Sequence, residues 1–244
     1  GNLICFNGEI YNFWELRNEI EGLGEHFISR CDTEVVLKAI RIFGLEATLN
    51  KLDGMYAGCY FDKNTSKMFI FRDPFGMKPL FYHSQKGKFI CASEAKAILP
   101  LMDSVEIDQS SSYNPLFFTG MPPAGKTMFK GVSSVKPGTY LEVGADGQIL
   151  LEKSFCDLID FVDQSQFDEN RRLPRKQLVE KYAETFEGSV RSHLISDAPL
   201  AVLFSAGLDS SMVAAIARKH QPNGQTLFKY QSSDLDDSLM ANQF

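Results

Sequence analysis

The feature that most constrains the fold is a series of short apolar segments in the middle of the chain, each closed by a turn signal. Four of them follow one another: Met55–Phe61, Met68–Arg72, Leu80–His83 and Phe89–Ala92. Polar or glycine-containing turns separate them, as is typical of strands. The pattern predicts a meander of strands. A last hairpin is predicted to pair Thr139–Val143 with Gln148–Leu151 across an Asp-Gly turn.

The first fifty residues predict a strand at Leu3–Phe6 and then two helices. Apolar residues of the first helix recur near a period of 3.6, at Phe13, Leu16, Ile20 and Leu23. Phe27-Ile28 predicts a short strand. Asp32-Thr33 predicts the cap of a second helix, which ends at Gly44. Several short strands with two early helices favour an α+β layer structure.

The C-terminal third shows a different pattern, that of a doubly wound α/β domain. Residues 157–173 are acidic and unperiodic and predict a linker, and Pro174 suits the first turn of the next helix. That helix should bury one stripe, formed by Leu178, Tyr182, Phe186, Val190 and Leu194. The wholly apolar run 199–204 predicts a strand covered on both faces. A small-residue loop, a helix from about Ser210 to His220 and a strand at 227–230 follow.

Composition excludes several classes of function. The net charge of −6 and the lack of basic runs argue against nucleic acid or an anionic membrane surface as the main partner. No apolar stretch approaches the roughly 18 residues needed to span a bilayer. The five cysteines form no C-x-x-C pair, which argues against a disulfide framework or a zinc site and favours a cytoplasmic location.

The loop Ser205–Ser211 is the first segment with chemical potential. Small residues between a buried strand and a helix N-terminus can point several backbone N–H groups at one spot, which predicts an anion site. Asp209 could cap the helix or orient a metal ion. The spacing is not that of a Walker loop. From composition alone, an ordinary strand-to-helix turn is an equal alternative.

The second segment is Asn7–Asn12, with Asp32-Thr33-Glu34 further along the chain. A strand that ends in Asn-Gly offers a side-chain amide beside an unhindered N–H, which is the composition of an oxyanion hole. Glu9 and Asp32 could bind an α-amino group. The alternative is structural, since Asn-Gly is a turn dipeptide and Asp32 would cap a helix in any case.

Both segments resemble known motifs. The loop Ser205–Ser211 resembles the S-G-G-L-D-S-S pyrophosphate loop of asparagine synthetases, with Ala206 in place of the first glycine. A left-handed backbone at that position would strain an alanine. The rest of the chain resembles class II glutamine amidotransferases of the asparagine synthetase type. The motifs that carry this resemblance are Asn7–Asn12, Asp32–Val35, Leu52–Met55, Arg72–Leu80, Ala92–Ala97, Phe129–Val132 and Pro137-Gly138.

The resemblance implies a fold and a domain order. Residues 1–156 would form an α+β glutaminase, an incomplete αββα sandwich of the N-terminal-nucleophile type that lacks its N-terminal portion. Residues 157–173 would be a linker, and residues 174–244 the first part of a doubly wound α/β ATP pyrophosphatase domain. Because the chain starts at Gly1 inside a predicted strand and stops at Phe244, we expect a fragment of a longer protein.

The resemblance also implies roles for individual residues. Asn7 and Gly8 match the oxyanion hole, and Asn7, Glu9 and Asp32 match the glutamine-binding residues. On the ATP side, the matching positions are Leu203, Ser205, Gly207, Asp209, Ser210 and, by its place on the second strand, Tyr230. ATP and Mg²⁺ would be the cofactors, with Asp209 a candidate metal ligand. Glutamine and aspartate would be the substrates, and a homodimer is an open alternative.

The family nucleophile is a cysteine whose own α-amino group acts as general base. None of the five cysteines here fits, so we expect this chain alone not to hydrolyse glutamine. Two alternatives to asparagine synthesis stay open. One is amidation of another carboxylate, on a sugar or a peptide, or ring closure by the adenylating half alone. The other is a non-catalytic remnant, which the missing cysteine and Ala206 both allow.

Overall fold

The computed structural model describes residues 1–85, 87–113, 123–221 and 226–229. It divides the chain into two compact units, Gly1–Val162 and Asp163–Phe244. The helices and strands of the first unit are, in chain order, β1 (Leu3–Ile10), α1 (Phe13–Gly22), α2 (Asp32–Phe43), α3 (Leu45–Leu49), β2 (Gly54–Asp62), β3 (Lys67–Arg72), β4 (Phe81–Gln85), β5 (Lys88–Ala92), α4 (Ala95–Ile98), η1 (Leu99–Leu101), α5 (Gln109–Ser112), β6 (Ser133–Ser134), β7 (Thr139–Val143), β8 (Ile149–Ser154) and η2 (Leu158–Phe161). Those of the second unit are α7 (Gln164–Arg172), α8 (Arg175–Ser192), β9 (Ala201–Phe204), α9 (Leu208–His220) and β10 (Thr226–Lys229).

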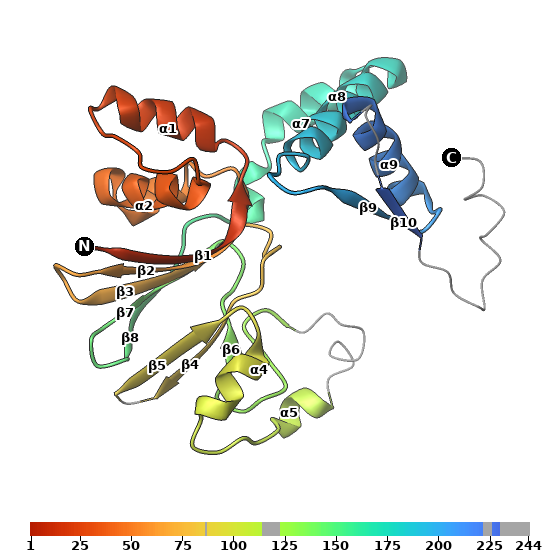
Figure 1. Cartoon of the computed structure of the whole chain (residues 1–244). Coiled ribbons are helices and arrows are strands. Elements are labelled where there is room, and N and C mark those ends of the chain that lie inside the picture. Colours follow the sequence, from red (N-terminus) through yellow and green to blue (C-terminus); the bar gives the residue numbers. More distant parts are fainter. Residues whose placement is uncertain (86, 114–122, 222–225, 230–244) are drawn as a thin grey trace. The chain divides into compact units, whose positions relative to one another are not determined.

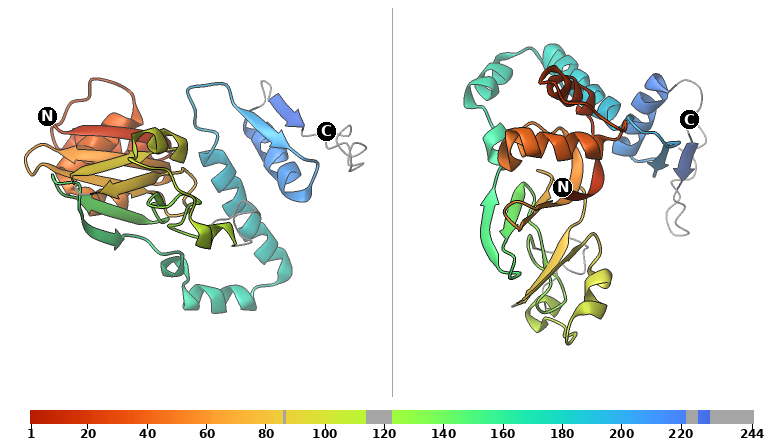
Figure 2. Two further views of the ribbon diagram at one scale, coloured as in Figure 1. Left: turned by 90° about the horizontal axis from the view of Figure 1, so that it is seen from below. Right: turned by 60° about the vertical axis from the view of Figure 1, so that its left-hand side comes forward.

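The first unit consists of two antiparallel sheets with helices on the outer face of the larger one (Figure 1). The larger sheet has the strand order β1-β2-β3-β7-β8 and the smaller one the order β5-β4-β6. Helices α1 and α2 lie on one side of the larger sheet and the smaller sheet on the other, and Figure 2 shows the same layers from two further directions. The predicted α+β sandwich is confirmed.

Two apolar clusters hold these layers together. The cluster between the helices and the larger sheet includes Ile20, Val36, Tyr56 and Phe71, all fully buried. The cluster between the two sheets has as its buried members Ala57, Ile70, Leu80, Val135 and Leu141. Side chains alternate along a strand. The central strands β2, β3 and β7 therefore contribute residues to both clusters, for example Tyr140 of β7 to the first and Leu141 to the second.

Strand β1 shows this alternation most usefully. Ile4, Phe6 and Ile10 pack against the helix-side cluster. The intervening residues, among them Asn7 and Glu9, therefore face the opposite side of the sheet, toward the smaller sheet. β1 is the edge strand of the larger sheet in the described part of the chain. Both properties place the candidate residues of β1 on an accessible margin of the fold.

The second unit is a βαβ arrangement. β9 and β10 are parallel neighbours, in register from Thr226 opposite Ala201 to Lys229 opposite Phe204. Helix α9 connects them, and α8 precedes them. This is the opening of the doubly wound domain that the sequence predicts. None of the helices in the described ranges combines the length and the apolar composition of a membrane-crossing segment.

Several local expectations were wrong. Phe27-Ile28 is not a strand, because the Ile28 N–H donates to the Glu34 carboxylate rather than to a strand partner. Asp32 is the first residue of α2, not its N-cap, which is Cys31. The expected linker contains helix α7, whose N-cap Asp163 accepts hydrogen bonds from the N–H groups of Ser165 and Gln166. The side chain of Asp163 therefore stabilises the start of α7, a helix whose sequence has no apolar periodicity.

Two burial expectations also failed in the second unit. On α8, Val190 is buried, whereas Leu178 and Tyr182 of the same predicted stripe are exposed. On β9, Phe204 is buried but Leu203 is 81% exposed, so one face of this strand is open in the described part of the chain. Both elements have the predicted apolar pattern, but only some of their apolar side chains are buried by the described residues.

Candidate active site

Asn7 lies on an exposed part of β1 and reaches across to the end of the smaller sheet. Its Nδ2 donates a hydrogen bond to Ser93 Oγ at 3.2 Å. Ser93 directly follows β5, so this bond joins two motifs that are 86 residues apart in the sequence. The amide of Asn7 is thereby oriented by Ser93, a residue to which the sequence motifs assign no role.

The backbone N–H of Gly8 points away from the sheet, toward the open edge of β1. Gly8 lies opposite Tyr56 in the β1–β2 register. Both backbone groups of Tyr56 are engaged on its other side, because its C=O accepts from Asp73 N at 2.8 Å and its N–H donates to Asp73 Oδ2 at 3.2 Å. In an antiparallel ladder the N–H and C=O of one residue face the same neighbour. Gly8 and Tyr56 are therefore a non-hydrogen-bonded pair.

Only glycine fits at position 8. A Cβ built there would lie 2.4 Å from the Met55 carbonyl oxygen and 2.7 Å from the Tyr56 Cα. The backbones of non-hydrogen-bonded pairs approach closely, which explains this contact. The glycine is therefore needed for strand packing, and the same packing directs its N–H outward beside the Asn7 side chain.

Asp32 meets the end of the same strand. Its Oδ2 accepts a hydrogen bond from the Ile10 N–H at 3.0 Å, and its Oδ1 accepts from the Thr33 hydroxyl at 3.3 Å. The Ile10 N–H and the Gly8 N–H lie two residues apart, on the same edge of β1. Glu9, between them, is partly buried. The structure thus brings together four of the predicted residues: Asn7, Gly8, Glu9 and Asp32.

Asp73 stabilises the backbone of Tyr56, the residue that pairs with Gly8. Its side chain is fully buried, and its carboxylate accepts hydrogen bonds from the N–H groups of Tyr56, Phe75, Met77 and Lys78. The neighbouring Arg72 donates to three backbone carbonyls, those of Gly76, Lys78 and Val135. Every one of these contacts is to backbone. Both residues are therefore structural, and Asp73 acts on the site by fixing Tyr56.

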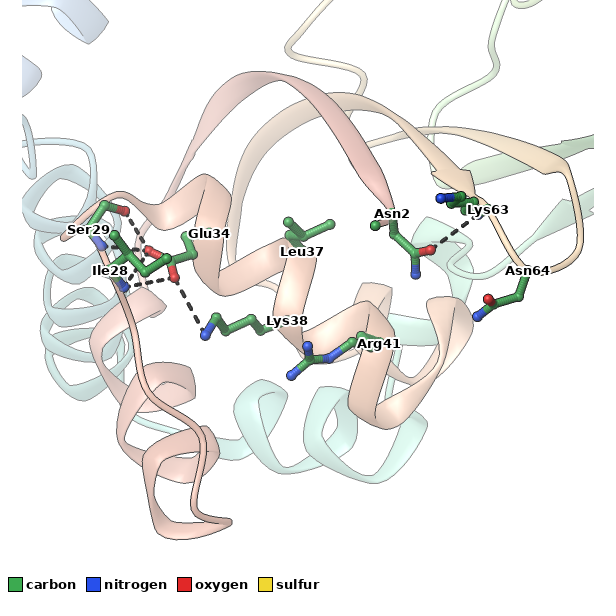
Figure 3. A pocket seen from close by; sticks show the side chains of 10 residues that line it. Asn2, Ile28, Ser29, Glu34, Leu37, Lys38, Arg41, Lys63 and Asn64 are labelled. Atoms are coloured by element: carbon green, nitrogen blue, oxygen red, sulfur yellow. Dashed lines mark hydrogen bonds and ion pairs between the residues drawn. The ribbon is translucent and has the colours of Figure 1, made fainter.

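Glu34 organises the loop that leads into α2. Its carboxylate accepts hydrogen bonds from Ile28 N–H, from Ser29 N–H and from the Ser29 hydroxyl, and Lys38 lies 3.5 Å away (Figure 3). Burial opposes ionisation, but these hydrogen bonds and the Lys38 charge outweigh it and lower the pKa of Glu34 to about 2. The loop is thus tied to the helix that carries Asp32.

A hollow of 1010 Å³ lies beside this loop, but the predicted site residues do not line it. Figure 3 shows Glu34, Lys38 and Arg41 on one side of it and Asn2, Lys63 and Asn64 on the other. Lys38 and Arg41 both form ion pairs with Glu25. Their charges are compensated, so the hollow has no surplus of positive charge on α2 that would select an anion.

The second candidate site is the loop between β9 and α9. Ser205 Oγ and Ser210 Oγ are 3.1 Å apart, and Ser210 Oγ donates to the Gly207 carbonyl at 3.2 Å. Gly207 is the N-cap of α9, with no side chain bonded to the first turn. The first N–H groups of a helix have no partner within the helix. At this exposed end they face outward, as an anion site requires.

Ala206 has a left-handed backbone. Its φ is +63°, a region that favours glycine and costs an L-residue roughly 1–2 kcal/mol. Ser66 is the other non-glycine residue with positive φ among the described residues. The strain foreseen for alanine at this position is present. A Cβ added at the next residue, Gly207, would find only Ser205 Oγ within 4 Å, at 3.5 Å, so the loop is open to a ligand.

The remaining predicted residues of the ATP side are less well defined. Asp209 lies exposed in the first turn of α9, and Leu203 is exposed on β9. Tyr230 lies outside the described residues. Within the described part of the chain, no group of three or more His, Cys, Asp or Glu could hold a metal ion. Asp209 thus stands without a second carboxylate, His or Cys cluster around it in this part of the chain.

The sequence motifs assigned no role to Ser93 or to Glu34. Both occur inside motifs that carry the resemblance, at Ala92–Ala97 and Asp32–Val35. Their roles depend on contacts with residues distant in the sequence, which motif spacing does not specify. The one sequence signal for these residues was that each is a polar side chain inside a motif that carries the family resemblance.

Two family models match the chain. Residues 1–155 match the model described as a glutamine amidotransferase domain. Residues 181–244 match the model described as asparagine synthase. The two matches follow the order of the two compact units, which meet between Val162 and Asp163.

Curated relatives cover nearly the whole chain. Asparagine synthetase [glutamine-hydrolyzing] 1 of Bacillus subtilis is 34% identical over 91% of this chain and 34% of its own length. A putative asparagine synthetase [glutamine-hydrolyzing] of Mycobacterium tuberculosis is 31% identical over 90% of this chain and 33% of its own. A solved glutamine phosphoribosylpyrophosphate amidotransferase of B. subtilis has a TM-score of 0.44 and 17% identity, over 100% of this chain and 50% of that one. The chain spans about a third of the length of the two curated relatives.

Proposed function

Because the chain belongs to the glutamine amidotransferase domain family, we propose that it contributes to glutamine-dependent asparagine synthesis. In this proposal the first unit holds glutamine while its amide nitrogen is released as ammonia. The second unit holds ATP, and ammonia amidates the side-chain carboxylate of aspartate. The names of the relatives support the reaction, and the order of the two family matches supports the pairing of the two sites.

The observation that carries the proposal is the meeting of distant motifs at the end of β1. The bond from Asn7 to Ser93 and the bond from Ile10 to Asp32 bring two distant segments to one strand, β1. An amide donor, an outward backbone N–H and a carboxylate are the groups that amide hydrolysis and amino-acid binding need together. Either bond alone would have an ordinary structural explanation.

In the first site, the Asn7 amide and the Gly8 N–H would stabilise the negative oxygen that develops when the glutamine amide is attacked. Two donors fixed in advance act on this charge without reorganising during the reaction. Glu9 and Asp32 would bind the α-ammonium group of glutamine. We assign the nucleophile to none of the five cysteines, because none has an adjacent α-amino group that could serve as base. This chain alone should therefore not hydrolyse glutamine.

In the second site, the exposed N–H groups at the start of α9 and the hydroxyls of Ser205 and Ser210 would hold the phosphates of ATP. When bound, ATP supplies the energy that makes a carboxylate reactive toward ammonia. The residues of this chain orient the phosphates. The contacts between Ser205, Ser210 and Gly207 keep the loop in shape for that task. In this proposal ATP is bound together with Mg²⁺, and Asp209, exposed in the first turn of α9, is the candidate ligand to that ion.

One observation favours a second candidate, a protein that has lost ATP-dependent chemistry. The loop holds Ala206, a residue with a Cβ, in a left-handed backbone conformation. The resulting strain disfavours the loop conformation that would bind phosphate. A loop that relaxes out of this conformation would lose the convergence of its N–H groups. In that case the first unit could still bind glutamine, while the second would bind no nucleotide.

The proposal is tested on the protein that contains this chain, with ATP and aspartate, using either glutamine or ammonium as nitrogen source. Asparagine should form from both sources, with pyrophosphate released in equal amount. Amidation of a different carboxylate would overturn aspartate as the acceptor. Glutamine hydrolysis without ATP consumption would instead favour the second candidate. A Ser205→Ala, Ser210→Ala double variant should lose synthesis from both nitrogen sources, whereas the exposed Ser196→Ala variant should keep it.

A further inference from the structure

A small cavity of 210 Å³ opens beside strand β4, and none of the residues proposed for glutamine or ATP lines it. His83 and Gln85 of β4 form one part of its lining. The loop after η1 contributes residues 102–104 and Glu106, and Lys130 completes the lining. Pockets that hold drug-sized ligands usually measure about 300–1,000 Å³. This cavity therefore fits a molecule of only a few non-hydrogen atoms.

His83 is the buried member of this lining, with 9% of its surface exposed. Its Nδ1 atom lies 2.8 Å from the carbonyl oxygen of Gly131. A backbone carbonyl only accepts hydrogen bonds, so Nδ1 carries a proton and donates. In the neutral ring the other nitrogen, Nε2, is then an acceptor. The contact with Gly131 thus selects the tautomer and leaves Nε2 in need of a donor.

The atom that faces His83 Nε2 is itself an acceptor. Gln85 Oε1 lies 3.5 Å from Nε2, and the amide nitrogen of Gln85 donates to Asp103 Oδ2 at 3.1 Å. Because a carboxylate only accepts, the bond to Asp103 holds the amide with its oxygen turned toward His83. Within the described ranges, no donor lies within hydrogen-bond distance of Nε2. A buried acceptor without a donor costs free energy, which a donating ligand recovers.

Charge determines which kind of donor this cavity favours. Lys130 Nζ lies 2.9 Å from Glu106 Oε2, so the charges of these two residues compensate each other. Asp103 contacts the neutral amide of Gln85 and, in the described part of the chain, forms no ion pair. The lining therefore keeps one uncompensated negative charge beside the two acceptors of His83 and Gln85. These groups together favour a compact cation that carries several N–H donors.

We propose that this cavity binds the primary ammonium group of a small alkylamine. An ammonium group has three donors and no acceptor, which matches His83 Nε2, Gln85 Oε1 and the Asp103 carboxylate. The free ammonium ion shares this chemistry, but only an alkylamine also has an apolar part to place against Met102. The proposal does not rest on the proposed function, because its residues are different and its readout is binding alone.

The test titrates the 244-residue chain at neutral pH with ethylammonium chloride and follows the ring nitrogens of His83 by NMR. The free chain should show Nδ1 protonated and Nε2 unprotonated. Ethylammonium should shift the Nε2 resonance with a Kd of about 1–10 mM, the range open to a ligand of so few atoms. Tetramethylammonium chloride is the matched control, since it has the same charge but no N–H donor, and it should cause no saturable shift. Ammonium chloride should bind more weakly than ethylammonium.

Two variants change the charge of the lining in opposite directions. Asp103→Asn keeps an oxygen that can accept from Gln85 but loses the charge, so the affinity for ethylammonium should fall about tenfold. Lys130→Gln leaves the Glu106 charge uncompensated, so the affinity should rise, which a merely structural role of Lys130 does not predict. The matched control Asp168→Asn, at an exposed position of α7, should bind like the unchanged chain.

The unchanged chain decides the question even if a variant does not fold. A proton on Nε2 in the free chain, equal shifts with ethylammonium and tetramethylammonium, or no saturable shift with ethylammonium would overturn the proposal. Tighter binding of ammonium than of ethylammonium would overturn the alkylamine and assign the cavity to the free ion.

Discussion

The Oδ2 atom of Asp32 accepts a hydrogen bond from the backbone N–H of Ile10 at 3.0 Å. This bond ties the first turn of α2 to the last residue of β1, 22 positions earlier in the sequence. An edge strand offers unpaired N–H groups. Asp32 occupies one of them, and the Gly8 N–H, two residues away on the same edge, points outward beside Asn7. In the proposed glutamine site, the Ile10 N–H therefore has a structural role and the Gly8 N–H the role of an oxyanion donor.

Replacing Asp32 by asparagine separates the two uses of this side chain. Asp32→Asn keeps an oxygen that can accept from Ile10, so the free energy of unfolding should change by no more than about 0.5 kcal/mol. It removes the negative charge, so the KM for glutamine should rise about tenfold, since hydrogen bonds to charged groups contribute about 1.5–3 kcal/mol. Denaturant unfolding of this chain and glutaminase kinetics of the protein that contains it measure the two effects. If stability falls while the KM is unchanged, Asp32 is only structural.

Gly8→Ala should destabilise the first unit by about 1–3 kcal/mol, the usual cost of overpacking. The added Cβ would lie 2.4 Å from the Met55 carbonyl oxygen, a backbone atom that cannot rotate away. Thermal unfolding measures the loss. The matched control is Gly22→Ala at the end of α1, where a Cβ finds nothing within 4 Å, and this variant should be as stable as the original or slightly more so. Equal effects of the two variants would contradict the packing argument.

Ala206→Gly should relieve the left-handed strain in the nucleotide loop. Glycine adopts a φ of +63° without steric cost, but it also gains freedom in the unfolded chain, so the net stabilisation should be about 0.5–1 kcal/mol. ATP affinity, measured by calorimetry, should rise with it. The control Ala215→Gly, at an exposed position inside α9, should instead lose about 1 kcal/mol. A loss of stability in Ala206→Gly would show that the alanine is not strained.

The lowered pKa of Glu34 predicts that acid destabilises the loop leading into α2. Because its pKa is lowered from 4.5 to about 2, its stabilising effect is complete above pH 4.5 and disappears as the pH falls through about 2. Its side chain is only 15% exposed, yet solvent screening reduces the effect to about 1 kcal/mol. Unfolding midpoints between pH 5 and pH 2 should fall less steeply in Glu34→Gln than in the original chain. Parallel curves would contradict this role.

Much of the fold could be predicted from the sequence because local patterns specify it. Alternating strands, an Asp-Gly turn and the glycine that ends α2 depend on residues close together in the chain. Gly147 has the positive φ that its turn requires, and Gly44 ends α2 as predicted. Helix α7 escaped prediction because polar side chains, not an apolar stripe, start it.

The site could be predicted only as a set of residues, not as an arrangement. Asn7, Gly8 and Asp32 stood out by motif, but the bond from Asn7 to Ser93 spans 86 residues and has no local signal. The outward direction of the Gly8 N–H depends on the pairing of Tyr56, whose backbone is engaged by Asp73, the residue that follows β3. Such relations arise from sheet register, which the sequence patterns did not specify.

The most direct test of the account is the nitrogen-source ratio of an Asn7→Ala variant, measured in the protein that contains this chain. If the Asn7 amide stabilises the oxyanion, glutamine-dependent synthesis should fall by about 10²–10³-fold, as when one donor of an oxyanion hole is lost. Ammonium-dependent synthesis should stay unchanged. An equal fall with both nitrogen sources, or no fall with either, would contradict the assignment of this end of β1 as the glutamine site.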